Sequence, residues 1–215
     1  MVHVFPCYVS LAYAQEEERS KTILRTGFTH YPPIQIYDWR TSTFTGSDVE
    51  FIEEIEKVAD VEIKVDYVPW KRLLVEVEKG NYQIIFSVVP TEERLSWADA
   101  TAPYYKVKIR LFLNKDFKRL HKIESLEDLE RVKSRARVGI LDSWIYSEKS
   151  QKINSSASLK NTVARDDNLL VQMEMGRIDF AILHEKSAKS HIRTLELKKI
   201  TSLKDEFEDL EYVIL

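Results

Sequence analysis

The sequence predicts an α/β protein of two lobes, and three observations predict it. Apolar stretches with the periods of helices and strands alternate along the chain, and the alternation starts again after residue 111. All six prolines lie before residue 104. Residues 101–200 are basic on balance, whereas the remainder is acidic. Two regions that differ in composition but repeat one pattern indicate two lobes rather than one uniform domain.

Five elements are expected in the first region: strands over residues 22–26, 61–67 and 84–89, and helices that begin at Ser47 and after Pro69. The strand over 61–67 alternates apolar and charged residues, while 84–89 is apolar, as in the middle of a parallel sheet. Ser47 and Glu50 have the spacing of a capping box, and Gly80 is expected to end the second helix.

The second region repeats this order. Ser125 is expected to cap a helix, residues 137–141 and 180–183 are expected to be strands, and a helix over 168–175 ends at Gly176. Extended segments around 106–113 and near the C-terminus join the two regions. A cleft between such lobes lies at the C-terminal ends of the strands, where small ligands bind.

Composition excludes several classes of function. Five glycines provide neither a GxGxxG fingerprint nor a phosphate-binding Walker loop. The single cysteine, Cys7, and five histidines without an HExxH pair predict no metal site, and we expect no cofactor. A net charge of -3 and a pI near 6.0 argue against nucleic acid as a partner.

The N-terminus has the pattern of an export signal. Residues 4–14 are mostly apolar and end in Ala12, Tyr13 and Ala14, a small-x-small cleavage site. A basic segment before them is missing, so a loose apolar N-terminus is the alternative. We expect residues 1–14 to be a signal peptide, and no apolar run is long enough to span a membrane.

Several short motifs, taken in order, resemble one family. They are Tyr31-Pro32-Pro33 with Tyr37-Asp38, Phe44-Thr45-Gly46 with Asp48, Pro69-Trp70, Thr91-Glu92-Glu93-Arg94, Pro103-Tyr104, Val138-Gly139-Ile140 and Gly176-Arg177-Ile178-Asp179. Together the motifs resemble the extracellular solute-binding proteins of ABC importers, family 3, which bind polar amino acids. The resemblance implies a two-lobed type II periplasmic-binding-protein fold, with two hinge-linked βα sheets and an interlobe cleft.

The resemblance also divides the chain. It implies a first lobe over residues 22–107, a second over 108–205, and a return strand over 206–215 that leads back toward the first lobe. Members of the family continue with further helices there, and this sequence does not include them, so we expect either a truncated product or a partner that covers the gap.

Arg94 matches the arginine that grips the ligand's carboxylate in the family. A guanidinium presents a planar fork that fits a carboxylate in two parallel hydrogen bonds. The alternative is a solvated arginine on a short helix. Ser87 and Thr91 complete the candidate ligand-binding residues around it.

The second lobe departs from the family pattern. His184, with Glu185 beside it, stands where relatives carry an aspartate for the ligand's ammonium, and Trp144 replaces a small hydroxyl residue. An imidazole is not a fixed anion, so we expect the solute not to be a simple zwitterionic α-amino acid but a small polar, anionic molecule held between Arg94 and His184. The alternative is a strand-end histidine satisfied by the backbone.

Aromatic residues are the remaining candidates for the cleft. Tyr31, Trp70, Tyr104 and Trp144 match positions that face the cleft in the family, where flat rings could enclose a solute. Trp70 also has the helical spacing of a core residue, and a core role is its alternative.

The expected function is therefore extracytoplasmic binding of a solute by a periplasmic monomer that delivers it to a membrane permease. A ligand-sensing module of the same fold, which feeds a signalling partner, is the alternative. An enzyme is disfavoured because Asp142, Ser143 and His184 lack the GxSxG context of a hydrolase.

Overall fold

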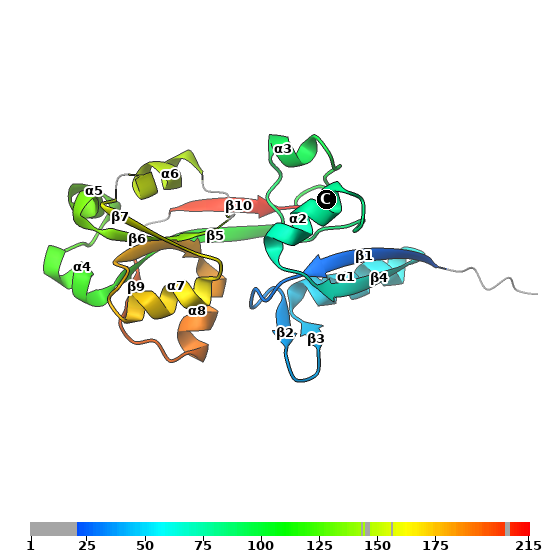
Figure 1. Ribbon diagram of the computed structural model, residues 1–215, viewed down its shortest axis with the longest axis horizontal. Coiled ribbons are helices and arrows are strands. Elements are labelled where there is room, and N and C mark those ends of the chain that lie inside the picture. Colours follow the sequence, from blue (N-terminus) through cyan, green and yellow to red (C-terminus); the bar gives the residue numbers. More distant parts are fainter. Residues whose placement is uncertain (1–20, 143, 145–146, 156, 205–206) are drawn as a thin grey trace, which may run out of the picture.

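The computed structural model describes residues 21–142, 144, 147–155, 157–204 and 207–215. It confirms the two-lobed α/β architecture, with the lobes side by side along the long axis of the molecule (Figure 1). The expected signal peptide, residues 1–14, lies outside the described residues.

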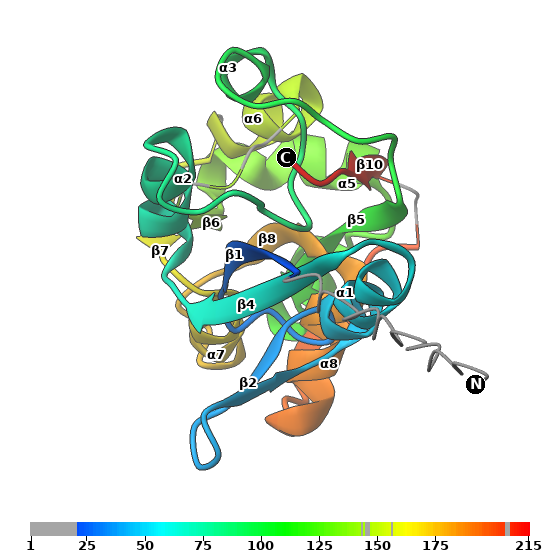
Figure 2. The ribbon, with the colours of Figure 1, turned by 90° about the vertical axis from the view of Figure 1, so that its right-hand side faces the viewer.

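Lobe one contains a parallel pair of strands between helices. Its elements are β1 (Thr22–Phe28), β2 (Ile36–Asp38), β3 (Thr43–Thr45), α1 (Ser47–Val58), β4 (Val61–Tyr67), α2 (Trp70–Glu78) and α3 (Glu92–Leu95). β1 pairs with β4 in parallel, and β2 and β3 form an antiparallel hairpin. Helices α1 and α2 lie on either side of the β1–β4 pair (Figure 2). The strand over 61–67 is confirmed, and the strand from residue 22 extends to Phe28.

The start of α1 differs from the prediction. Ser47 is the first helical residue and Gly46 is the N-cap, without a side-chain cap, so the predicted capping box is wrong. Gly46 has φ 115°, and a Cβ there would lie 2.4 Å from the carbonyl oxygen of Ile34. The close approach of this loop requires glycine, and Asp48 in the first turn then enters the core.

The predicted strand over 84–89 is also wrong as a regular element. Ile84 makes one parallel bridge to Thr26, and Val88 makes one antiparallel bridge to Val213. Between them Ser87 has φ 54°, a left-handed conformation that interrupts the strand. The apolar pattern reports burial here, because Ile85, Phe86 and Val88 are all buried.

Lobe two is built on a six-stranded mixed sheet with the order β10-β5-β8-β6-β7, in which β9 also pairs with β5. Its elements are β5 (Tyr105–Asn114), α4 (Lys115–His121), α5 (Leu126–Val132), the 3-10 turn η1 (Lys133–Arg135), β6 (Arg137–Leu141), α6 (Glu148–Ser155), β7 (Leu159–Val163), α7 (Asp166–Glu174), β8 (Phe180–His184), α8 (Glu185–Thr194), β9 (Ile200–Ser202) and β10 (Glu208–Tyr212). The Ser125 cap and the strand over 137–141 are confirmed, and α7 begins two residues before the predicted start.

Two long segments connect the lobes. The segment around 106–113 is not a bare linker but part of β5, which pairs with both β8 and β10. After β10, the last residues return to lobe one, where Val213 and Leu215 exchange backbone hydrogen bonds with Val88 and Ile85. The C-terminal segment packs in the lobe-one core on the α2 side, so it holds the two lobes together.

Candidate functional site

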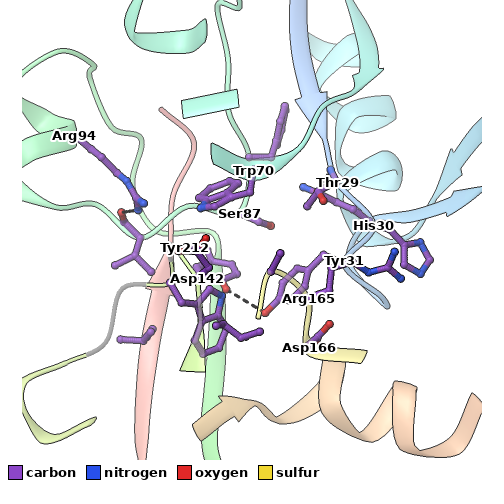
Figure 3. Close-up of a pocket in the computed structure, with 17 residues that line it drawn as sticks. Thr29, His30, Tyr31, Trp70, Ser87, Arg94, Asp142, Arg165, Asp166 and Tyr212 are labelled. Carbon is purple, nitrogen blue, oxygen red and sulfur yellow. Dashed lines mark hydrogen bonds between the residues drawn. The ribbon is translucent and has the colours of Figure 1, made fainter. Parts of the chain in front are cut away.

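A cavity of about 120 Å³ lies between the two lobes, and residues of both lobes form its walls (Figure 3). A water molecule needs about 10–15 Å³ on this measure, so the cavity admits a solute of about ten non-hydrogen atoms. Its lining is Thr29, His30, Tyr31, Gln35, Trp70, Phe86, Ser87, Val89, Arg94, Leu141, Asp142, Trp144, Ala164, Arg165, Asp166, Leu210 and Tyr212. Tyr31, Trp70, Ser87, Arg94 and Trp144 are therefore sequence-predicted residues that the structure brings together.

The lobe-one wall is held by a network of hydrogen bonds around Asp48. Ser87 Oγ donates to the Asp48 carboxylate at 2.8 Å, and Gln35 Nε2 donates to it at 2.7 Å. The hydroxyl of Tyr104 accepts from the Ser87 backbone N–H at 2.9 Å and donates to Asp48 at 3.2 Å. Burial raises the pKa of Asp48, and the hydrogen bonds oppose that rise. This network fixes Ser87 in its left-handed conformation at the cavity wall.

Arg94 lies at the edge of the same wall. Thr91 caps the short helix α3 and accepts a hydrogen bond from the Arg94 backbone N–H. One guanidinium nitrogen donates to the Val89 carbonyl at 2.7 Å, and the group lies 5.6 Å from the Trp70 ring centre. Only 6% of Arg94 is exposed, and burial lowers its pKa. Within the described part of the chain, no acidic side chain forms an ion pair with Arg94, so its charge is open to an anionic group.

Aromatic side chains form much of the remaining wall. Tyr31 of lobe one and Tyr212 of lobe two place their hydroxyl oxygens 3.5 Å apart (Figure 3). Burial raises the pKa of Tyr212 to about 12, so both hydroxyls are neutral at physiological pH. Trp70 lines the cavity and also packs against the lobe-one core, so its two readings are compatible.

Lobe two contributes three charged residues that the sequence analysis did not place among the ligand-binding residues, although it named Asp142 in the disfavoured hydrolase set. Asp142 follows β6, Arg165 is the N-cap of α7, and Asp166 is the first residue of α7. Asp142 forms an ion pair at 2.5 Å with Lys71 of α2, which crosses the cleft. The signal in the sequence for Asp166 is the acidic pair Asp166–Asp167, which precedes the apolar face of a helix and is typical of a helix start.

Asp166 is buried, with 8% exposure, and three groups approach its carboxylate. Ser187 Oγ donates to Oδ2 at 2.5 Å, the Asp167 backbone N–H donates to Oδ1 at 3.0 Å, and His191 Nε2 lies 3.1 Å from Oδ1. Burial alone would raise the pKa of Asp166, but His191 and the hydrogen bonds lower it. The carboxylate is thus held ionised at the cavity.

His184 and Glu185 do not line the cavity, contrary to the sequence expectation. The His184 ring is 2% exposed because it caps α8, where Nδ1 accepts from the Ser187 backbone N–H at 3.2 Å. Burial lowers the pKa of His184 to about 4, so the ring is neutral. Glu185 forms ion pairs with Arg110 and Lys189 instead. The backbone thus satisfies Nδ1 of His184, as the alternative expected, whereas its buried Nε2 has no hydrogen-bond partner among the described residues; the His184 and Tyr31 ring centres are 5.6 Å apart.

Thr91 and Tyr104 also lie off the cavity lining. Thr91 is occupied as a helix cap, and Tyr104 stacks on Phe51 with ring centres 4.7 Å apart while its hydroxyl joins the Asp48 network. Both act through the residues that they hold, Arg94 and Ser87.

Other chemistries gain no support. No group of three or more metal-ligating side chains occurs among the described residues, and no helix of that part of the chain is long and apolar enough to cross a membrane. Ser143, the nucleophile of the disfavoured hydrolase set, lies outside the described residues.

Comparisons with known proteins show the family and the fold of the chain. A model of the bacterial extracellular solute-binding proteins, family 3, matches residues 24–174. A Campylobacter jejuni protein described as a probable histidine-binding protein is 27% identical over 182 residues, which cover 83% of this chain and 66% of that protein. The chain thus spans about two thirds of the length of this curated relative.

Two solved structures share the fold. One is an amino acid ABC transporter substrate-binding protein from Streptococcus pneumoniae bound to L-arginine, at 21% identity and TM-score 0.72, with 91% of this chain and 80% of that chain covered. The other is a histidine kinase sensor domain with similarity to periplasmic binding proteins, at 20% identity and TM-score 0.75, with 91% and 82% covered. The fold is the two-lobed type II periplasmic-binding-protein fold, and the chain belongs to the bacterial extracellular solute-binding proteins of family 3.

Proposed function

We propose that this protein binds a free amino acid or a closely similar zwitterion between its lobes, outside the cytoplasm, and delivers it to an ABC importer. The observation that carries the proposal is the cavity itself, where a buried arginine without an acidic partner among the described residues faces a wall that holds a buried aspartate. A solute with one anionic and one cationic group satisfies both walls.

The charged residues that line the cavity argue against the purely anionic solute that the sequence predicts. That expectation depended on His184 as the lobe-two contact and on the absence of a carboxylate there. The cavity is lined instead by Arg94 and Arg165 together with Asp142 and Asp166. An acid without a cationic group would bring a second negative charge to the ionised Asp166, and like charges in a buried site repel. The mixed lining therefore favours a zwitterion.

The size and the aromatic walls limit the solute further. A volume that admits about ten non-hydrogen atoms fits a single amino acid rather than a peptide. Tyr31, Trp70 and Trp144 provide flat apolar surface for the solute's carbon atoms. Because contacts come from both lobes, the solute stabilises the closed arrangement, which is the form that a binding protein presents to its permease.

A thermal-shift screen of the twenty standard amino acids tests the proposal. A solute that binds only the folded state raises stability by about 2.7 kcal/mol at a hundredfold excess over Kd. We expect a clear shift with at least one amino acid. No shift with any of them between pH 5.5 and 8.0 would overturn the proposed ligand class.

Two analogues of the best amino acid provide matched controls. Its carboxamide lacks the anionic group that Arg94 would bind, and its α-hydroxy acid lacks the cationic group. We expect both to bind at least tenfold more weakly. An α-hydroxy acid that binds as tightly as the amino acid would support the anionic solute instead.

Delivery to an importer rather than to a sensor is tested separately. The protein, loaded with that amino acid, is added to its permease in liposomes, and we expect solute-dependent ATP hydrolysis. Solute-dependent stimulation of a sensor kinase, without an effect on any permease of the host, would favour the signalling alternative.

A further inference from the structure

One cluster of the lobe-two wall has a chemistry that the binding of a zwitterion alone does not explain. The cluster is buried and consists of Asp166, which lines the cavity, and of Ser187 and His191 on α8. Both α8 side chains contact the Asp166 carboxylate, and one of them, His191, can carry a proton. His191 is 6% exposed, and no other described carboxylate lies within ion-pair distance of its ring. The carboxylate of Asp166 thus faces the cavity on one side and the titratable His191 on the other.

We infer that Asp166 is the specificity-determining residue for the cationic group of the solute, and that this group replaces the proton on His191, so that binding releases a proton. The inference rests on the proposed function, because it assigns the cation of the same solute. It also assigns a position in the chain, the first turn of α7, that sequence reading did not single out.

The geometry leaves room for the incoming cation. A carboxylate accepts about four hydrogen bonds, two on each oxygen. Among the described residues, the Asp167 N–H donates to Oδ1, and His191 Nε2 lies 3.1 Å from the same oxygen in ion-pair contact without hydrogen-bond geometry. On Oδ2, Ser187 is the one described donor. The open position on Oδ2 belongs to a carboxylate that lines the cavity, so a cationic nitrogen of the solute can approach it there.

The cationic group of the solute and the protonated His191 compete for the negative charge of Asp166. Without solute, Asp166 favours the protonated form of His191, and its charge outweighs the burial that lowers the pKa of this histidine. A solute cation on Oδ2 supplies the positive charge that the buried carboxylate needs, and it repels a second positive charge on His191. The proton then leaves His191 for solvent, and the neutral ring stays beside the carboxylate.

Other charged groups near His191 do not provide the same link. Arg165 is paired with Asp167, so these two largely cancel at the start of α7. His30 faces His191 from lobe one with ring centres 6.3 Å apart, and its pKa is lowered by burial, by Arg165 and by His191. His184 is neutral, and Lys186 contacts the Tyr105 hydroxyl rather than Asp166. Of the three histidines His30, His184 and His191, only His191 has a raised pKa.

Isothermal titration calorimetry of the whole protein tests the inference, with the standard amino acid that gives the largest thermal shift as probe. Titrations at pH 6.0 in two buffers of different ionisation enthalpy count the protons released. We expect release of up to one proton per solute, and an affinity that rises with pH by up to about tenfold per unit while free His191 is protonated. At higher pH the affinity should level off.

His191→Gln is the decisive variant, because the glutamine amide can still donate to Asp166 but cannot titrate. We expect the variant to bind with a pH-independent affinity and without proton release. His121→Gln on α4 removes a histidine far from the cavity and should behave as the wild type. A His191→Gln protein that keeps the wild-type proton release and pH profile would overturn the inference.

Asp166→Asn separates the inference from the proposed function. We expect at least a hundredfold loss of affinity for the amino acid but a smaller loss for its α-hydroxy analogue, which brings no cation. A tight, unchanged affinity for the amino acid would show that the cation lies elsewhere while the cleft still binds. Absence of binding by every amino acid to the wild type would overturn the proposed function itself.

Discussion

The two walls of the cleft each contain a buried aspartate, and the two residues have opposite surroundings. Asp48 in lobe one is 2% exposed, and its side-chain donors in the described part of the chain, Gln35, Ser87 and Tyr104, are all neutral. Asp166 in lobe two is 8% exposed and lies against His191. Burial raises the pKa of Asp48, whereas His191 brings that of Asp166 below its usual value despite burial.

The difference teaches how burial of the same group serves two purposes. A carboxylate surrounded by neutral hydrogen-bond donors organises the wall, and Ser87 is the part of that network that reaches the cavity. A carboxylate that shares its charge with a histidine keeps an adjustable charge at the cavity surface. Lobe one is therefore the fixed wall and lobe two the responsive one.

The largest effect on the stability of the fold is expected when Asp48, the centre of the lobe-one network, is removed. Asp48→Ala removes the carboxylate that accepts from the buried Gln35 and the half-buried Ser87 and Tyr104, and we expect a loss of about 2–4 kcal/mol in the free energy of unfolding. Urea denaturation measures it, with Asp99→Ala on the surface of the same lobe as the control. A loss no greater than that of the control would show that the network does not organise lobe one.

Removal of the cation of lobe one should affect binding rather than folding. Arg94→Ala should weaken the amino acid found in the screen by about 2–5 kcal/mol, because the solute's carboxylate is then left in a closed site without its partner. Arg94→Lys should recover little, since an ammonium cannot present the planar fork. Calorimetry decides, and unchanged affinity in Arg94→Ala would contradict the role.

The Asp166–His191 pair of lobe two should also make the stability of the unliganded protein depend on pH. Because the folded-state pKa of His191 is raised, its contribution is fully present below the unfolded pKa near 6.5 and is lost as pH rises through the folded value. The contribution of Asp166, whose pKa is lowered, is lost only as pH falls through its folded value.

These signs predict a difference between two proteins. The Tm of the wild type relative to His191→Gln should be higher at pH 5.5 than at pH 8.5. His30 and His184 have lowered pKa values and act in the opposite direction. The His184 contribution is common to both proteins and cancels, whereas burial, the largest cause of the His30 shift, remains in both and His191 adds to that shift only in the wild type. An equal Tm difference at both pH values would contradict the pairing of His191 with Asp166.

The smallest effect is expected at the ion pair that crosses the cleft. Lys71 and Asp142 are 64% and 41% exposed, and such pairs contribute about 0–1 kcal/mol. Lys71→Ala should therefore lower solute affinity by no more than about fivefold, and 1 M salt should remove the difference. Lys79→Ala at the end of the same helix is the control. A tenfold or larger effect would make this pair a latch of the closed form.

Sequence reading recovered the parts of the site that depend on local pattern. The alternating and apolar stretches predicted β1, β4, β6 and β8, and Arg94 was identified as a candidate by a short motif. The lobe-two wall depends on contacts between distant segments, since Asp166 and His191 lie on different helices that only the fold brings together. His184 was misplaced because a helix-capping interaction turns its ring away from the cavity.

The same limit applies to the backbone of lobe one. A run of apolar residues over 84–89 predicts burial correctly, but the left-handed Ser87 within it depends on the Asp48 network, whose members come from four separate segments. Gly46 is a residue type that is typical of turns, but the structure requires glycine there because the Ile34 carbonyl lies close to it. Pattern predicts which residues are buried, and long-range contacts decide their conformation.

The most direct test of the cleft as an amino-acid site is a crystal structure of the protein with the amino acid that gives the largest thermal shift. We predict that the amino acid lies between the lobes, with its carboxylate on the Arg94 guanidinium and a cationic nitrogen within hydrogen-bond distance of Asp166 Oδ2. A solute bound outside this cavity, or in it with its cationic group turned away from Asp166, would contradict the account.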